Sequence, residues 1–402
     1  MKTIFDTYTD SELKEILQKI VSFIRNGRTL EFIKKNAPKA QINELISIAK
    51  AQIKNTKTTH QIYFSEEDLQ FATPDMIAEY RAKKLKTDTI IELGCGIGLQ
   101  TIAFAKECKK VIAIDIDKRK IAYAKKNISL LGISNVTFIY GDALDEHIIK
   151  QCKGDKVFLD PERKQTEKER TLATITPNIQ KIIAAYKEIA SEICIELPPQ
   201  IQEDMITQEK IAFDEKEYIS INGKINRLHI YIDNKRDKKE KKELITAVSL
   251  PSQMKLSSED TLFKKKIVSA ITKEYSFLAE IDEAVQKASL IDTLPVEGDL
   301  FIWKNKQFLI LRKKEINPFL QPQSPFLKLH LFIDTAKNKE ELILKLQKQD
   351  IGKILIRGSI SNEEYWPFRK SIEQNLKGNK TAEVFIFSDY VITIPLKEDK
   401  EN

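Results

Sequence analysis

The sequence predicts an α/β fold: a seven-stranded, doubly wound sheet with a helical region before it and a smaller α+β part after it. Short apolar runs alternate with amphipathic helical stretches between residues 89 and 197, a pattern typical of parallel βα units. A glycine-rich turn, ELGCGIG at 92–98, joins the first of these strands to its helix. Later strands end in acidic residues, and open sheets bind ligands at the carboxyl ends of their strands. These three observations predict a ligand site at one edge of the sheet.

The bulk composition is that of a globular protein without a membrane span. The chain has 402 residues, enough for two or three domains, and contains no run of about 18 apolar residues. Its first residues, MKTIFDTYTD, include acids and lack the apolar segment of a secretory signal. Four cysteines form no CxxC pair, which is typical of a reduced cytoplasmic protein, and four scattered histidines predict no metal site.

Helical periodicity dominates the first 60 residues and returns shortly after them. Asp10 or Ser11 can cap the first helix, and the pattern breaks at an Asn-Gly pair. Thr73 is expected to cap a later helix that has Pro74 at its first position. Helices are expected over 10–24, 30–35, 40–54 and 74–84.

The alternating core follows. Strands are expected at 89–93, 111–115, 136–140, 157–160 and 193–197, and helices at 99–107, 118–131, 143–151 and 177–190. Strands 217–221 and 228–232, joined by an Asn222-Gly223 turn, complete the seven as an antiparallel hairpin. Right-handed crossovers then give a doubly wound sheet with one antiparallel edge.

The pattern changes after residue 245 to α+β. Strands are expected at 245–250, 299–303, 307–312, 328–334, 351–356, 382–387 and 390–394, with helices at 260–271, 276–288 and 361–376. No glycine turn or acidic cluster indicates a second catalytic unit here. The predicted division is a helical region at 1–60, a catalytic domain at 61–235, a linker and α+β connecting region at 236–324 and a terminal domain at 325–402.

The glycine turn indicates a nucleotide-like cofactor. Gly94, Gly96 and Gly98 lack Cβ atoms, so their backbone can pass close to a bulky ligand. Asp115 ends the next strand, where a carboxylate can hold a ribose hydroxyl pair. The dinucleotide fingerprint G-x-G-x-x-G requires a further small residue where Leu99 stands, so a nicotinamide dinucleotide is less favoured.

The ELGCGIG segment resembles motif I of the class I methyltransferases that use S-adenosylmethionine. Over nearly the whole chain, the sequence is similar to a family of such methyltransferases with a C-terminal THUMP-like domain, related to the RNA cap guanine-N2 methyltransferase group. Motif I is widely shared, whereas the segment at 71–85 and the order of the later segments are more specific. The matching segments are FATPDMIAEYRAKKL at 71–85, IELGCGIG at 91–98, VFLDPERK at 157–164, TPNI at 176–179, EYISINGKI at 217–225 and KILIRGSI at 353–360.

The resemblance implies how the cofactor is held. Glu92 would lie near the methionine amino group, Asp115 would hold the ribose hydroxyls, and Asp142 would accept a hydrogen bond from the adenine amine. Asp142 can also act as the cap of the helix that follows it, and this role is compatible with binding adenine. The predicted cofactor contacts are Phe71, Thr73, Glu92, Gly94, Cys95, Gly96, Gly98, Asp115, Ile116, Asp142 and Ala143, with Phe71 and Thr73 closing the pocket from the N-terminal side.

The segment Asp160-Pro161-Glu162-Arg163 is the predicted catalytic site. Related enzymes that methylate exocyclic amines commonly carry Asp/Asn-Pro-Pro followed by an aromatic residue, whose ring stacks on a flipped base. Here Glu162 replaces the second proline and Arg163 replaces the ring, as in the family that the chain resembles. Because the motif is incomplete, these residues do not by themselves predict methylation of an amine nitrogen. Arg163 can contact a phosphate or stack on a base, and Glu162 can act as acceptor or base. The alternative is that both begin a solvated loop.

The resemblance further implies an RNA substrate, tRNA or rRNA, and an RNA-binding role for residues 325–402; the alternative is a dimerisation or packing module. The net charge is +7, and lysines clustered at 34–35, 83–86, 118–126 and 235–242 can either contact phosphates or form a solvated surface. Two other functions stay open: methyl transfer to a protein or small metabolite, and RNA binding without catalysis. The sequence indicates neither the modified atom nor the oligomeric state.

Overall fold

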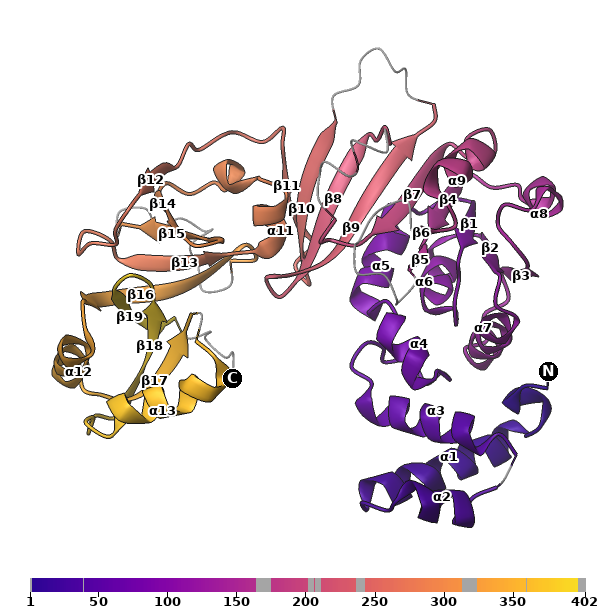
Figure 1. Cartoon of the computed structure of the whole chain (residues 1–402). Helices are drawn as coiled ribbons and strands as arrows, with labels where there is room; N and C mark the ends of the chain where they lie inside the picture. Colours follow the sequence, from indigo (N-terminus) through magenta and orange to yellow (C-terminus); the bar gives the residue numbers. More distant parts are fainter. Residues whose placement is uncertain are drawn as a thin grey trace. The chain divides into compact units, whose positions relative to one another are not determined.

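The protein is described from a computed structural model (Figure 1). The described residues are 2–38, 40–163, 175–201, 206, 211–235, 243–312, 324–358 and 360–396, without the side chains of Glu162 and Arg163. Contacts divide the chain into two compact units. The first comprises Met1–Lys216 and Leu228–Glu243, and the second comprises Glu217–Arg227 and Leu244–Asn402.

The chain begins with helices, as predicted. They are η1 (Ile4–Asp6), α1 (Asp10–Arg25), α2 (Leu30–Asn36), α3 (Ile42–Lys54), α4 (Glu66–Phe71) and α5 (Asp75–Lys84). Two predicted caps are wrong. Thr9, rather than Asp10 or Ser11, caps α1 in a reciprocal capping box with Glu12. The cap position of α5 is Pro74, and Thr73 lies before it.

The main sheet has nine strands, two more than predicted. Its strands are β1 (Thr89–Leu93), β2 (Lys110–Asp115), β3 (Val136–Tyr140), β4 (Lys156–Leu159), β7 (Glu192–Leu197), β8 (Glu215–Ile221), β9 (Lys224–Asp233), β10 (Leu244–Leu250) and β11 (Met254–Ser257). Their order is β11-β10-β8-β9-β7-β4-β1-β2-β3. The five strands of the βα units are parallel, and β9 pairs antiparallel with β7. The antiparallel pairings lie at one end of the sheet, as predicted, but β10 and β11 extend this end beyond the predicted hairpin.

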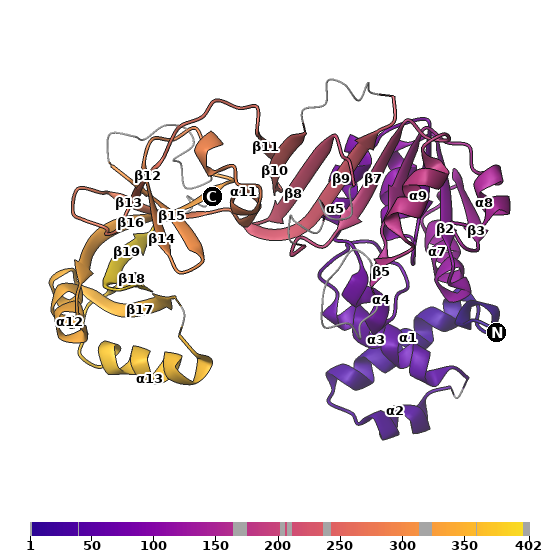
Figure 2. The same ribbon diagram turned by 45° about the horizontal axis from the view of Figure 1, so that its top comes forward.

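Helices cover both faces of the parallel part of the sheet. They are α6 (Leu99–Glu107), α7 (Lys118–Leu130), α8 (Glu146–Gln151) and α9 (Ile179–Tyr186). Side chains of α5, α6 and α7 share one apolar cluster with alternate residues of the strands, while α8 and α9 lie on the other face (Figure 2). Helix α8 starts three residues later than predicted, because Asp145 caps it by accepting from His147 N at 2.8 Å.

The second unit contains an eight-stranded sheet of order β12-β14-β15-β13-β16-β19-β18-β17. Its strands are β12 (Lys266–Val268), β13 (Phe277–Ile281), β14 (Asp299–Trp303), β15 (Lys306–Leu311), β16 (Leu327–Ala336), β17 (Ile351–Arg357), β18 (Lys380–Ile386) and β19 (Tyr390–Pro395). Its helical elements are α11 (Glu283–Lys287), η4 (Ile291–Thr293), α12 (Lys339–Lys348) and α13 (Asn362–Glu373). Helix α12 packs on β16 and β17, and α13 packs on β17 (Figure 2).

Two helices predicted in this region are wrong. Residues 260–271 contain β12 instead, and residues 276–288 form β13 followed by the short α11. The apolar run of β13 is buried between β15 and β16, to both of which it pairs antiparallel. Short apolar runs fit either helix or strand, and here pairing partners distant in sequence decide the outcome.

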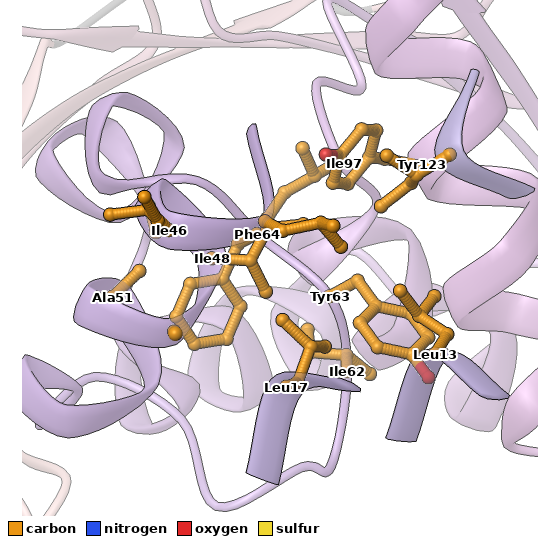
Figure 3. Close-up of a cluster of buried hydrophobic side chains, with 14 of the residues drawn as sticks. Leu13, Leu17, Ile46, Ile48, Ala51, Ile62, Tyr63, Phe64, Ile97 and Tyr123 are labelled. Atoms are coloured by element: carbon orange, nitrogen blue, oxygen red, sulfur yellow. The ribbon is translucent and has the colours of Figure 1, made fainter. Parts of the chain in front are cut away.

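The N-terminal helices share one hydrophobic core with the glycine turn. Leu13 and Leu17 of α1 pack in the same cluster as Tyr63, Ile97 of the turn and Tyr123 of α7 (Figure 3). A polar link reinforces this packing at one point. The amide of Asn127 donates to the carbonyls of Tyr63 and Ile97, at 2.9 and 3.0 Å. The helical region therefore supports the glycine turn from outside the sheet.

The cysteines and His330 have structural roles. All four cysteines are buried thiols. His330 is fully buried between two carboxylates, with Nδ1 2.5 Å from Glu383 and Nε2 2.9 Å from Glu280. Burial disfavours its charge, but the two carboxylates outweigh burial and raise the pKa of His330.

Within the described residues, no helix is both long and apolar enough to cross a membrane.

Candidate functional site

The glycine turn brings β1 close to the end of β4. The amides of Gly94 and Cys95 both donate to the carbonyl of Ile114, at 2.9 and 3.0 Å, so the turn folds over β2. Gly94 has φ +83°, and a Cβ there would lie 2.7 Å from the carbonyl oxygen of Asp160. Only glycine accepts both this dihedral angle and this contact without displacing its neighbour. The predicted catalytic residue Asp160 thus lies against the turn.

Asp115, at the end of the neighbouring strand β2, stabilises the glycine turn. Its Oδ2 accepts from the amide of Gly96 at 2.7 Å, and its Oδ1 accepts from the amide of Asp117 at 2.8 Å. The side chain is buried, and burial raises the pKa of Asp115. The sequence predicted a ribose ligand at this position, but not that the carboxylate also holds the turn in shape.

Glu92 is a buried acid directly before the turn. It is 1% exposed and accepts from Thr101 Oγ1 at 2.6 Å. Burial raises the pKa of Glu92 to about 8, and the nearby charges of Asp160 and Asp115 act in the same direction. Three carboxyl groups therefore influence one another at the carboxyl edge of the sheet, which makes this edge suited to a cationic ligand.

Asp160 and Pro161 end β4 beside this acidic edge. The amide of Asp160 donates to the carbonyl of Leu93 at 3.2 Å, and its side chain is half-buried. The next two residues form β5 (Glu162–Arg163), which pairs with β6 (Ile175–Thr176). The side chains of Glu162 and Arg163 lie outside the described part of the chain, so their predicted roles stay predictions.

A buried arginine that the sequence analysis missed lies behind the acidic edge. Arg81 of α5 is fully buried, with its guanidinium 4.3 Å from the ring centroid of Phe158. It donates to Gln100 at 2.7 Å, to His229 Nε2 at 2.8 and 3.2 Å, and to Glu196. Burial disfavours its charge, but Glu196 and other acids, including Asp160, outweigh burial and raise the pKa of Arg81.

This arginine had a signal in the sequence. The buried stripe of α5 consists of Ile77, Ala78, Arg81 and Ala82. A charged residue on such a stripe requires a buried partner. The partners lie 115 and 148 residues away, at Glu196 and His229, so no local pattern identifies them.

Arg81→Met is expected to lower the free energy of unfolding by about 3–5 kcal/mol, because it leaves the Glu196 carboxylate, whose side chain is only 11% exposed, without its cation. Urea denaturation measures this loss. The double variant Arg81→Met/Glu196→Gln should recover part of it, since no uncompensated charge then remains. A single variant within about 1 kcal/mol of the native protein would contradict this role for Arg81.

The end of β3 carries the residues predicted to contact adenine. Gly141 donates to the carbonyl of Asp115 at 3.0 Å, which places the following turn beside β2. Asp142 is exposed and accepts from Leu144 N at 2.9 Å, so it caps a turn and not α8, and the predicted role as a helix cap is wrong. The hydroxyl of Tyr186 donates to the carbonyl of Ala143 at 2.9 Å and fixes this turn from α9.

Two predicted contacts come from exposed apolar residues. Ile116, directly after Asp115, is 65% exposed, and Phe71 at the end of α4 is 56% exposed. The guanidinium of Arg119, in the first turn of α7, binds both carboxylate oxygens of Asp68 at 2.7 and 3.1 Å, which brings α4 to the end of β2. The contacts of Ile116 and Phe71 with the cofactor stay predictions. Thr73 is buried, and its contact with the cofactor stays a prediction.

Comparisons with known proteins agree with this geometry. A family model described as a methyltransferase domain matches residues 84–246. Trimethylguanosine synthase of Schizosaccharomyces pombe is 42% identical over 90 residues, which are 21% of this chain and 37% of that protein. The tRNA (uracil(54)-C(5))-methyltransferase of Saccharomyces cerevisiae is 37% identical over 81 residues, 20% of this chain and 13% of that protein. The chain thus spans well under half the length of these curated relatives.

A solved structure has the same fold over nearly the whole chain. It is of a candidate methyltransferase from Porphyromonas gingivalis W83, with a TM-score of 0.69 and 15% identity, and the match covers 97% of this chain and all of the other. These comparisons show a class I methyltransferase domain at 84–246, whose cofactor is S-adenosylmethionine. Among the described residues, no three His, Cys, Asp or Glu side chains are grouped so as to hold a metal ion.

Proposed function

We propose that the protein transfers a methyl group from S-adenosylmethionine to a base in structured RNA, tRNA or rRNA. The observation that carries the proposal is the contact between Gly94 and the Asp160 carbonyl, which places a half-buried acid against the turn that would hold the cofactor. The names of the two curated relatives, a trimethylguanosine synthase and a tRNA methyltransferase, support RNA as the substrate.

In this proposal the residues of the chain bind, orient and exclude water. The bound cofactor supplies a methyl group on a sulfonium. Glu92 holds its amino group, Asp115 holds the ribose hydroxyls, and Asp142 with Ala143 holds the adenine. Asp160 and the backbone that follows it accept hydrogen bonds from the target base. Glu162 and Arg163 are proposed to contact the base or a phosphate. The THUMP-like domain at 325–402 is proposed to bind RNA, and the helical, catalytic and connecting regions keep their predicted limits.

Glu92 should make the cofactor-free protein less stable as the pH rises. Since the pKa of Glu92 is raised from 4.5 to about 8, its contribution to stability is complete below pH 4.5 and is lost as the pH rises through 8. The loss at pH 8 should be about 4 kcal/mol, and Glu92→Gln should abolish it. Chemical denaturation at several pH values measures both. Equal pH dependence in the two proteins would contradict this assignment.

Methyl transfer can be tested on the RNA itself. The purified full-length protein is incubated with methyl-labelled S-adenosylmethionine and with RNA, protein and metabolite fractions from a strain that lacks the gene. Label in tRNA or rRNA, and a modified nucleoside missing from that strain by mass spectrometry, are the expected results. RNA from the parent strain is the control, because its target should already be methylated. Label confined to the protein or metabolite fraction would favour the alternative substrates.

A further inference from the structure

A groove of about 860 Å³ lies on the N-terminal side of the first unit. Helix α1 forms one wall, the end of α3 and residues 58–64 form the other, and Leu130 at the end of α7 contributes to the rim. None of the lining residues belongs to the glycine turn. Helix α7 starts three residues after Asp115 and has 13 residues, so its length places Leu130 roughly 20 Å from the acidic edge. The groove is therefore a second concave site.

The groove combines polar walls with an apolar floor. Leu17, Ile62 and Phe64 are buried in the core below it, where they belong to the cluster drawn in Figure 3. Five polar residues of α1 line it at a spacing of four, four, four and three, so they share one side of the helix. They are Asp10, Lys14, Gln18, Ser22 and Arg25, and the facing wall carries the amides of Gln52 and Gln61.

The charge of the groove is positive. Lys14 and Arg25 are exposed, and neither has an ion-pair partner within the part of the chain that the structure describes. Asp10 is the acid among the lining residues, and Lys126 neutralises it. Eleven residues separate the two free cations along α1, which corresponds to about 16 Å. A ligand that spans the groove therefore meets two separated positive charges with hydrogen-bonding amides opposite them.

We infer that this groove binds a segment of the RNA phosphodiester backbone, with Lys14 and Arg25 on phosphates. The inference rests on the proposed RNA substrate and adds to it a contact surface outside the acidic edge. Regularly spaced anions suit two cations about 16 Å apart, because a nucleic-acid strand rises only about 3.4 Å per nucleotide. The facing amides suit sugar hydroxyls and base edges, which both donate and accept.

The test removes the two charges and leaves the fold intact. Lys14→Gln/Arg25→Gln changes exposed side chains only, and Lys34→Gln/Lys35→Gln removes the same number of charges from exposed positions on α2 that do not line the groove. Binding of unfractionated tRNA is titrated at several salt concentrations, with S-adenosylhomocysteine present. The groove variant should bind about tenfold more weakly, with a salt slope shallower by about 1.5, and the α2 variant should stay within about twofold of the native protein.

Kinetics give a second readout. Loss of a contact made equally in the ground and transition states raises KM for RNA and leaves kcat unchanged. If both double variants lose the same affinity, or neither loses any, the groove assignment is wrong while RNA remains the substrate. If the native protein binds S-adenosylhomocysteine but no tRNA or rRNA, the RNA substrate is itself wrong, and the groove proposal falls with it.

Discussion

The Gly94→Ala protein should bind S-adenosylmethionine at least about a hundredfold more weakly than the native protein. Alanine at φ +83° costs about 1–2 kcal/mol, and its Cβ would lie 2.7 Å from the Asp160 carbonyl oxygen. Either the turn or the end of β4 must then move, and both carry residues proposed to contact the cofactor or the base. Isothermal titration calorimetry measures the affinity, and thermal unfolding shows whether the variant is folded.

Gly27→Ala is the matched control. Gly27 also has a positive φ, +69°, but a Cβ there would meet nothing within 4 Å, and the residue lies between α1 and α2. This variant should lose about 1 kcal/mol of stability and keep its cofactor affinity. If both glycine variants bind the cofactor as the native protein does, the turn is not the cofactor site.

Asp160→Ala should lower the rate of methyl transfer about a thousandfold while leaving cofactor binding intact, because the loss of one positioned acceptor or base commonly costs that much. The two backbone contacts of this residue, with Leu93 and Gly94, do not involve its side chain and should persist. Initial rates with labelled cofactor and calorimetry of the same preparation measure the two quantities separately.

Two further variants make this result specific. Asp160→Asn keeps the volume of the side chain and one acceptor oxygen but removes its charge. If Asp160 acts as a hydrogen-bond acceptor, this variant should keep part of the activity. If Asp160 acts as a base, the activity should be lost. Asp88→Asn is the control. It removes an exposed charge directly before the first residue of β1, at the end of the strand opposite to the glycine turn, and should leave the rate unchanged. Native rates in both Asp160 variants, with cofactor binding preserved, would show that Asp160 is not catalytic.

The sequence predicted the alternating core closely because its signals are local. The bounds of β1, α6 and β3 agree with the predicted ones to the residue. Each is defined by a hydrophobic period, a glycine turn or an acid at a strand end, all within a few neighbouring residues. The second unit was predicted less well, since β12 and β13 owe their conformation to β14, β15 and β16, which lie further along the chain.

The same distinction holds for the site. The glycines and Asp115 are recognisable because the backbone conformation of a turn and the position of a strand end are local properties. Tyr186, Thr101 and Asn127 have no such signal, because each supports the site through a partner on another element.

The sequence alone determined the order of strands and helices in the βα core, the glycine turn and the acids that follow it, since short-range backbone preferences and hydrophobic periods decide these features. Only the tertiary structure determined the charge states and pKa shifts of the buried ionisable side chains. The raised pKa of Glu92, the buried cation of Arg81 and the imidazole of His330 between two carboxylates all depend on burial and on partners far along the chain. Desolvation and ion pairing act through space, so they are defined only after the chain has folded.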